Sequence, residues 1–235
     1  MDIRTAMTDP RLLSLLHFAD SAFPTGGYAH SFGLETYSQT GVVRSREDLE
    51  RYLVAQIEGS AGPCDATAAV GALRVAARDD LQACREIDAT LEAMKPVKEF
   101  REGSRQMGRQ TLRVASALTG EARLVRYAAD VDKGLAPGHH AVAYGLAASA
   151  LGWEPEAAAT AYLYSTTALL VGATLRLLSM GQMEGQRVLW GLHPIIERAA
   201  REAAARDAAD LWSFAHGIEI AGIRHATLEM RLFRS

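Results

Sequence analysis

Seven histidines among 235 residues raise the question of a metal site. His225 and Glu229 are four residues apart, so on a helix they would face the same side and could share a metal ion or a hydrogen bond. Zinc and nickel sites need more than two protein ligands, which makes His225 and Glu229 weak metal candidates and favours a structural pair. The same reasoning applies to His216 and Glu219.

His139 and His140 are adjacent in the sequence. On a helix their side chains would diverge by about 100°, so they cannot readily share one ion. At the start of a helix they could instead donate to an anion or to the carboxylate of a partner. We therefore assign no residue to catalysis and expect no tightly bound cofactor.

The sequence also has none of the common nucleotide or nucleophile motifs. It contains no glycine-rich run ending in Gly-Lys-Ser/Thr, no dinucleotide fingerprint and no Gly-x-Ser-x-Gly elbow. Acidic pairs such as Glu47-Asp48 and Asp79-Asp80 fall at predicted helix starts, where carboxylates stabilise the positive end of the helix dipole. Capping explains these pairs without catalysis.

Two features are more typical of an interface than of a catalytic site. The stretch from Phe23 to Glu35 is punctuated by Gly26, Gly27 and Gly33, which permit unusual backbone angles or close approach, although a tight turn is the simpler interpretation. Arg176 lies within a strongly apolar stretch, so its guanidinium needs either an internal ion pair or a protein neighbour.

Two further features point the same way. Gly181 and Gly185 alternate with Gln182 and Gln186, a pattern that suits either a close helix crossing or an amide-bearing contact face. The sequence finishes with an apolar pair between arginines, which we expect to dock on this domain or on another protein. The predicted partner-facing set is Gly26, Gly27, Ser31, Gly33, Glu35, Arg176, Gln182, Gln186, Arg231, Leu232, Phe233 and Arg234, shaped also by Gly181 and Gly185.

Helices must position these groups. The spacing of apolar residues and the positions of glycine and proline indicate about ten helices and no convincing strand. Asp9-Pro10 marks a helix start, and Ser45 with Asp48 resembles a capping box. We expect a break at 59–63, followed by alanine-rich helices at about 65–78 and 80–94 and a long helix from Pro96 to Gly120. Further helices are expected through Asp130 and over 139–152 and 156–180. We also expect an interruption at Pro194 and a last helix that carries Leu211, Trp212, Phe214 and Ile218.

The long helix after Pro96 has an apolar and small seam, with positions alternating by three and four residues. Such a seam packs on another helix, either in the same chain or in a second copy. Its candidates for a dimer contact are Phe100, Ser104, Met107, Gly108 and Thr111.

Composition limits the class of protein. Apolar residues make up 49% and charged residues 23%, and the net charge is −3, so nucleic-acid binding has no electrostatic support. Cys64 and Cys84 match no zinc motif and are typical of reduced thiols in a cytoplasmic protein. The apolar stretch 157–180 contains polar residues and Arg176, which favours a buried core helix over a membrane span.

No linker, repeat or compositional shift divides the sequence. We therefore predict a single all-α domain over 1–235, packed as an irregular bundle. Its segments 1–25 and 226–235 are expected to depend on a partner for their order.

Taken together, these features resemble the UreF family of urease accessory proteins. The resemblance rests on five strings that occur in the family's order across nearly the whole chain: PTGGYAHSFGLE, SRQMGRQ, GHHAVAYGLAASALG, LRLLSMGQMEGQ and RLFRS. It implies an all-α, non-catalytic maturation factor for the nickel enzyme urease, which binds nickel at most transiently.

The resemblance also implies the partners. Proteins of this family typically dimerise, bind UreD (also called UreH) through their terminal regions and recruit the GTPase UreG, and the complex delivers nickel to the urease apoprotein. The absence of a phosphate loop in this chain is consistent with GTP hydrolysis by UreG. An influence on that hydrolysis is expected, because a scaffold acts on a partner by binding its states unequally.

Three other classes fit the composition. A helical enzyme would need convergent polar groups in an interior pocket. A transcription regulator would need a basic recognition helix, which the near-neutral charge disfavours. A nickel-storage protein would need more histidine and cysteine than this chain has.

Overall fold

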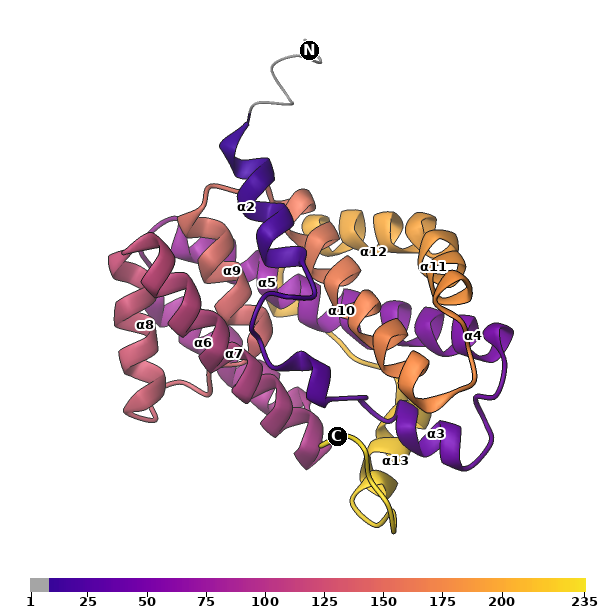
Figure 1. Ribbon diagram of the computed structural model, residues 1–235. Coiled ribbons are helices and arrows are strands. Elements are labelled where there is room, and N and C mark those ends of the chain that lie inside the picture. The colour runs from indigo at the N-terminus through magenta and orange to yellow at the C-terminus, as the bar shows by residue number, and fades with distance from the viewer. Residues whose placement is uncertain (1–8) are drawn as a thin grey trace.

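The computed structural model describes residues 9–235, and within that range every regular element is helical and none is a strand. The predicted all-α class is therefore confirmed, whereas the first eight residues of the predicted segment 1–25 lie outside the described part (Figure 1). The α-helices are α2 (Pro10–Ala19), α3 (Leu34–Gln39), α4 (Arg46–Gln56), α5 (Thr67–Ala76), α6 (Leu81–Met94), α7 (Lys98–Thr119), α8 (Ala122–Asp132), α9 (His140–Ala150), α10 (Pro155–Leu177), α11 (Gln182–Gly191), α12 (His193–Ala205) and α13 (His216–His225).

Local capping signals placed several helix starts correctly. The Asp9 carboxylate accepts from the Arg11 backbone N–H at the start of α2, and the side chain of Asp80 caps α6 in the same way through Ala83. Ser45 and Asp48 form the predicted capping box of α4. These bonds satisfy backbone donors that lack a partner in the first turn of a helix, so the sequence alone was sufficient to locate them.

The apolar stretch of the sequence forms α10, which crosses the middle of the molecule between α6–α9 on one side and α11 and α12 on the other (Figure 1). By length and composition α10 could cross a membrane, but 56% of its most apolar window is buried inside the protein, where it packs on α5, α11 and α12. The predicted core helix is confirmed. Cys64 and Cys84 are both buried and free.

The seam of α7 is occupied inside the chain, because α7 packs along α9. Thr111 is completely buried and Ser104 nearly so, and a Cβ on Gly108 would lie 2.0 Å from the Gly138 carbonyl oxygen. Met107 is also buried, and only Phe100 of the five dimer candidates is half-buried. Of the two options that the sequence left open, the structure therefore shows packing within one chain for this seam.

The predicted break at 59–63 is wrong. Instead of ending, the chain continues as a π-helix, η2 (Ile57–Ala66), which contains Pro63 and leads directly into α5. The wider turn leaves carbonyl groups available to other segments: the Phe214 N–H donates to the Gly59 oxygen at 2.7 Å, and the Trp212 N–H donates to the Pro63 oxygen at 3.2 Å. Tertiary hydrogen bonds thus stabilise a turn that the local sequence disfavours.

The same contact corrects the predicted last helix. After the short 3₁₀ turn η3 (Ala208–Asp210), residues Leu211, Trp212 and Phe214 lie in a non-helical segment along η2, and α13 begins only at His216. Ile218 is on α13 as expected and is buried. The hydrogen bonds to η2 hold these preceding residues out of a helix.

Candidate functional site

The last ten residues, 226–235, which we call the tail, fold back onto the glycine-rich loop at 26–33. The Ser31 and Phe32 backbone N–H groups donate to the Ser235 main-chain oxygen at 2.6 and 3.0 Å, and the Ser31 hydroxyl donates to the same oxygen at 2.7 Å. The Arg234 N–H donates to the Ala29 oxygen at 2.8 Å. The two segments therefore form one folded unit, although the Ser31–Ser235 contact spans 204 positions in the sequence.

The glycines give the loop its shape. Gly33 has a φ of +89° immediately before α3, and a Cβ at this position would lie 3.0 Å from the Ile218 oxygen of α13, so both conformation and space favour glycine. Phe32 also has a positive φ, +49°, which is unusual for an aromatic residue. Its N–H bonds to Ser235 and its carbonyl accepts from the Tyr52 hydroxyl, and these two bonds stabilise the strained turn.

The carboxylate of Glu35, at the start of α3, accepts two backbone hydrogen bonds from the tail. Its Oε1 accepts from the Leu232 N–H at 2.7 Å and its Oε2 accepts from the Phe233 N–H at 3.0 Å. Glu35 is only 2% exposed and Ser31 is fully buried, so neither side chain can serve as the partner-facing contact predicted for it. Instead, these buried side chains hold the tail on its own domain, which is one of the two alternatives that the sequence left open for the end of the chain.

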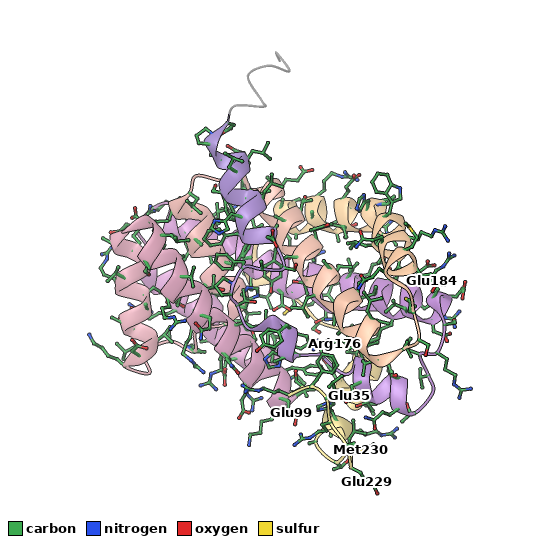
Figure 2. The ribbon with its side chains drawn as sticks, in the orientation of Figure 1. Glu35, Glu99, Arg176, Glu184, Glu229 and Met230 are labelled. Atoms are coloured by element: carbon green, nitrogen blue, oxygen red, sulfur yellow. The ribbon has the colours of Figure 1, made fainter. Side chains whose placement is uncertain are left out.

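His225 connects Glu35 to a second carboxylate. Its Nε2 lies 2.9 Å from Glu35 Oε2 and its Nδ1 lies 2.7 Å from Oε2 of Glu99, near the start of α7. Glu99 Oε1 in turn accepts from the Arg231 guanidinium of the tail at 3.0 Å. We refer to Glu35, His225 and Glu99 as the clasp, because they join α3, α13 and α7 and bind the tail. Figure 2 labels the two carboxylates, Glu35 and Glu99.

The predicted pairing of His225 with Glu229 is wrong. Helix α13 ends at His225, so the regular four-residue spacing is lost, and Glu229 is exposed in the turn beyond it (Figure 2). Both nitrogens of His225 are already bonded to carboxylates. Across residues 9–235, no group of three or more His, Cys, Asp or Glu side chains is arranged to hold a metal ion.

Arg176 lies at the rim of this unit. Its guanidinium carbon stands 4.1 Å from the centroid of the Phe233 ring, and its Nη2 donates to the Tyr28 oxygen at 2.5 Å. Arg176 falls in the last turn of α10, where the helix reaches the surface, and among the described residues it forms no internal ion pair, which was one of the two options left open for it. Arg176 is exposed, and so is Tyr28, whose carbonyl it bonds and whose exposure is 75%. Leu232, which precedes the stacked Phe233 in the tail, is 59% exposed.

The glutamines lie elsewhere. Gln182 and Gln186 are exposed one turn apart on α11, and Glu184 of that helix lies far from the tail in Figure 2. Gly185 is buried, and a Cβ there would lie 3.1 Å from Val171 Cγ1 of α10, which is the close helix crossing that its spacing allowed. The structure therefore brings Arg176, the loop and the tail together, and separates the two glutamines from them.

His139 and His140 are buried at the start of α9, where their partners come from the same chain. His139 Nδ1 lies 3.1 Å from the Ser104 hydroxyl and Nε2 lies 2.9 Å from the Glu92 carboxylate. Burial lowers the pKa of His139 to about 3 and that of His140 to about 4. Both are thus neutral core histidines rather than donors to an external anion.

A cavity of about 590 Å³ lies between residues 18–28 and helices α7, α9 and α10. Aromatic side chains such as Phe18, Phe23 and Tyr144 contribute to its wall, with His140 and Gln110 among its polar groups. This cavity is one place where the alternative of a helical enzyme would put its chemistry. The depressed pKa of His140 leaves that imidazole neutral at physiological pH.

Glu99 is a member of the clasp that could not be identified from the sequence. At the start of a long helix it resembles an ordinary residue favoured by the helix dipole, and its bond to His225 spans 126 positions. Neither capping nor periodicity reports on a contact of this kind.

Comparison with known proteins found one matching family model and several similar relatives. A family model described as UreF matches residues 43–193. A "Urease accessory protein UreF" from Bacillus sp. (strain TB-90) is 32% identical over 225 residues, covering 96% of this chain and 99% of the relative. A protein of the same description from Lachnoclostridium phytofermentans is 33% identical over 227 residues, covering 97% of this chain and 100% of the relative.

Proposed function

Because this chain belongs to the UreF family of urease accessory proteins, we propose that it is a non-catalytic maturation factor that joins UreD (UreH) to the GTPase UreG. In that complex it supports insertion of nickel into the urease apoprotein. The relatives are named accessory proteins, which is consistent with action through binding rather than through catalysis.

One observation supports a binding role above the others: the docked tail and the loop create a composite surface beside Arg176. Tyr28 and Leu232 present apolar area there, and the Arg176 guanidinium is held in place by Phe233 and the Tyr28 carbonyl. Tyrosine and arginine dominate the binding energy of many protein interfaces. We propose that this surface, which we call the tail–loop surface, contacts UreG.

Binding alone is sufficient for the proposed effect on GTP hydrolysis. A scaffold shifts the equilibrium between two states of a partner only as far as it binds one state more tightly than the other. The tail–loop surface would therefore contact a part of UreG that differs between its nucleotide states. We further propose that nickel associates with this chain only transiently, and that the chain acts in the cytoplasm as a homodimer whose contact lies outside the occupied seam of α7.

The test is the pair of variants R176A and R109A. Arg109 is an exposed arginine on α7 and provides a matched control for the loss of one surface cation. We expect R176A to weaken capture of UreG by about tenfold or more, the loss of one strong interface contact, while the melting temperature of the isolated chain stays close to that of R109A. If R176A melts early but captures UreG normally, Arg176 is only a packing residue and the proposal is wrong.

A second experiment tests the whole role. Urease apoprotein, UreD, UreG, GTP and nickel are combined with and without this chain, and urease activity is measured. We expect activation only in the complete mixture. Full activation without this chain would contradict the proposed function, whatever the behaviour of Arg176.

A further inference from the structure

The clasp contains more acceptors than a neutral histidine can satisfy. His225 is completely buried, and each of its ring nitrogens faces a carboxylate oxygen, at 2.7 Å for Glu99 and 2.9 Å for Glu35. An ionised carboxylate only accepts hydrogen bonds, whereas a neutral imidazole has one N–H and one lone pair. With both carboxylates ionised, the observed contacts therefore require both ring nitrogens to be protonated.

His139 provides an internal comparison. It is equally buried and also faces one carboxylate, Glu92, but its second nitrogen faces the Ser104 hydroxyl. A hydroxyl can donate, so a single N–H on His139 satisfies both contacts. The different partners of these two histidines, rather than their burial, set the number of protons that each one needs.

The clasp is also the support on which the tail rests. Both oxygens of Glu35 accept backbone N–H groups of the tail, from Leu232 and Phe233, and Glu99 accepts from Arg231. The tail covers Glu35, which is 2% exposed when the tail is docked. Two carboxylates in such a site need positive charge, and once the tail leaves, water can solvate them instead.

Other charged groups surround the clasp. Arg231 of the tail is bonded to Glu99, and the loop contributes His30, whose pKa is lowered by its burial and by nearby Arg234. On α13 itself, Arg224 lies beside Tyr37 of α3, and the pair His216–Glu219 occupies the opposite end of the helix. Of these groups, Arg231 is bonded directly to a clasp carboxylate and His225 is the histidine between the two carboxylates.

We propose that docking of the tail is coupled to a proton on His225, so that the tail–loop surface is complete at neutral or lower pH and is lost as pH rises. The docked state keeps the second imidazole proton because Glu35 and Glu99 are shielded from water. Wherever the docked state binds one proton more than the released state, each unit of rising pH reduces docking about tenfold.

Amide hydrogen exchange on the full chain tests the coupling without any partner. The probes are the Leu232 and Phe233 amides, with the Leu112 and Ala115 amides of the α7 core as references, and rates are corrected for the intrinsic effect of pH. We expect protection at 232 and 233 to fall by up to about tenfold per pH unit between pH 6 and pH 9, while the α7 amides keep theirs. Constant protection at 232 and 233 from pH 6 to 9 overturns the proposal.

The variant E99Q distinguishes proton coupling from ordinary fraying. A glutamine amide can donate to a bare His225 Nδ1 and still accept from Arg231, so the second proton is no longer needed. We expect E99Q to retain a docked tail and to lose the pH dependence. A pH dependence in E99Q equal to that of the wild type contradicts the role of His225.

Imidazole nitrogen chemical shifts of the wild-type chain give a measurement that does not depend on the folding of a variant. At pH 6 we expect His225 to have the signature of a doubly protonated ring and His139 that of a neutral one. A neutral His225 ring with a docked tail overturns the proposal. All three measurements concern the isolated chain, so a failure of the role in urease maturation leaves them unaffected.

Discussion

At the scale of single residues, the buried histidines make the chain sensitive to acid. His139 and His140 keep depressed pKa values of about 3 and about 4 in the folded state, chiefly because burial disfavours the charged ring. In the unfolded chain both would titrate near 6.5. Below that pH the unfolded state binds more protons than the folded state, so stability is complete above pH 6.5 and is lost as pH falls towards 4.

We therefore predict that the free energy of unfolding drops by about 2 kcal/mol per histidine between pH 7 and pH 5, measured by urea denaturation. The variant H139Q removes one of these rings and should reduce the drop by about 2 kcal/mol. H216Q, which removes an exposed histidine, is the control and should leave it unchanged. Equal pH dependence in H139Q and the wild type would show that His139 does not contribute. This effect has the opposite sign to that of the clasp, which weakens as pH rises.

Whether the sequence reveals the role of a residue depends on how far along the chain its bonding partner lies. Asp9, Ser45 and Asp80 bond within three residues, and the sequence located them. Glu35 bonds to amides 197 and 198 positions away, and the same glutamate looked like a surface residue of a polar, glycine-rich motif. Its side chain type was informative, but only the tertiary structure shows which groups it accepts from.

At the scale of elements, η2 is the clearest case of a local preference overridden by tertiary contacts. Gly59 lies where the backbone of Phe214 approaches most closely, and a Cβ at this position would lie 2.8 Å from the Phe214 oxygen. We predict that G59A displaces residues 211–215 and lowers the free energy of unfolding by about 1–3 kcal/mol, the usual cost of overpacking.

The matched control is G172A on α10. Gly172 is exposed in the middle of a helix, and nothing lies within 4 Å of an added Cβ. Alanine there should raise stability by up to about 1 kcal/mol, because glycine is a poor helix former. Urea midpoints measure both variants, and a neutral G59A would mean that the contact between η2 and residues 211–215 is easily adjusted.

The elements themselves were largely predictable for a physical reason. Helix starts with a polar cap and helices with a sustained apolar stripe are specified by neighbours in the sequence, as in α4, α6 and α7. The errors fell where a distant segment supplies the hydrogen bonds. Pro63 and the residues from Leu211 to Phe214 stabilise one another, so neither could be assigned correctly without the other.

At the scale of the whole molecule, two surfaces lie at opposite ends. Helix α2 projects at one end, and α13 with the tail lies at the other (Figure 1). Helix α2 presents Leu12, Leu13 and Leu16 to solvent, with exposures of 44%, 72% and 56%, an arrangement unusual for a helix that needs no partner. Under the proposed function, the two ends would therefore allow UreD and UreG to be bound at the same time.

We predict that L13E weakens capture of UreD by about tenfold or more and leaves the melting temperature unchanged, since the side chain is exposed in the free chain. L118E changes a leucine of similar exposure, 58%, on α7 and serves as the control. If L13E captures UreD as well as L118E does, α2 is not part of the UreD contact and the prediction is wrong.

The helical class and the interior position of α10 followed from composition and apolar pattern, which are properties of the whole chain. The candidate site was only partly predictable. The sequence identified the loop, Arg176 and the tail as separate features, but not that they form one surface, since nothing local encodes the return of the tail to the loop.

That return has a consequence for biosynthesis. A ribosome adding 5–20 residues per second needs about 10–40 seconds to pass from Ser31 to Ser235, the 204 positions that separate these bonded residues. Throughout that interval a nascent chain has most of its helices but no completed tail–loop surface. Under the proposed function, chains that have not yet reached Ser235 would lack the surface that contacts UreG, and assembly would have to wait for synthesis of the tail.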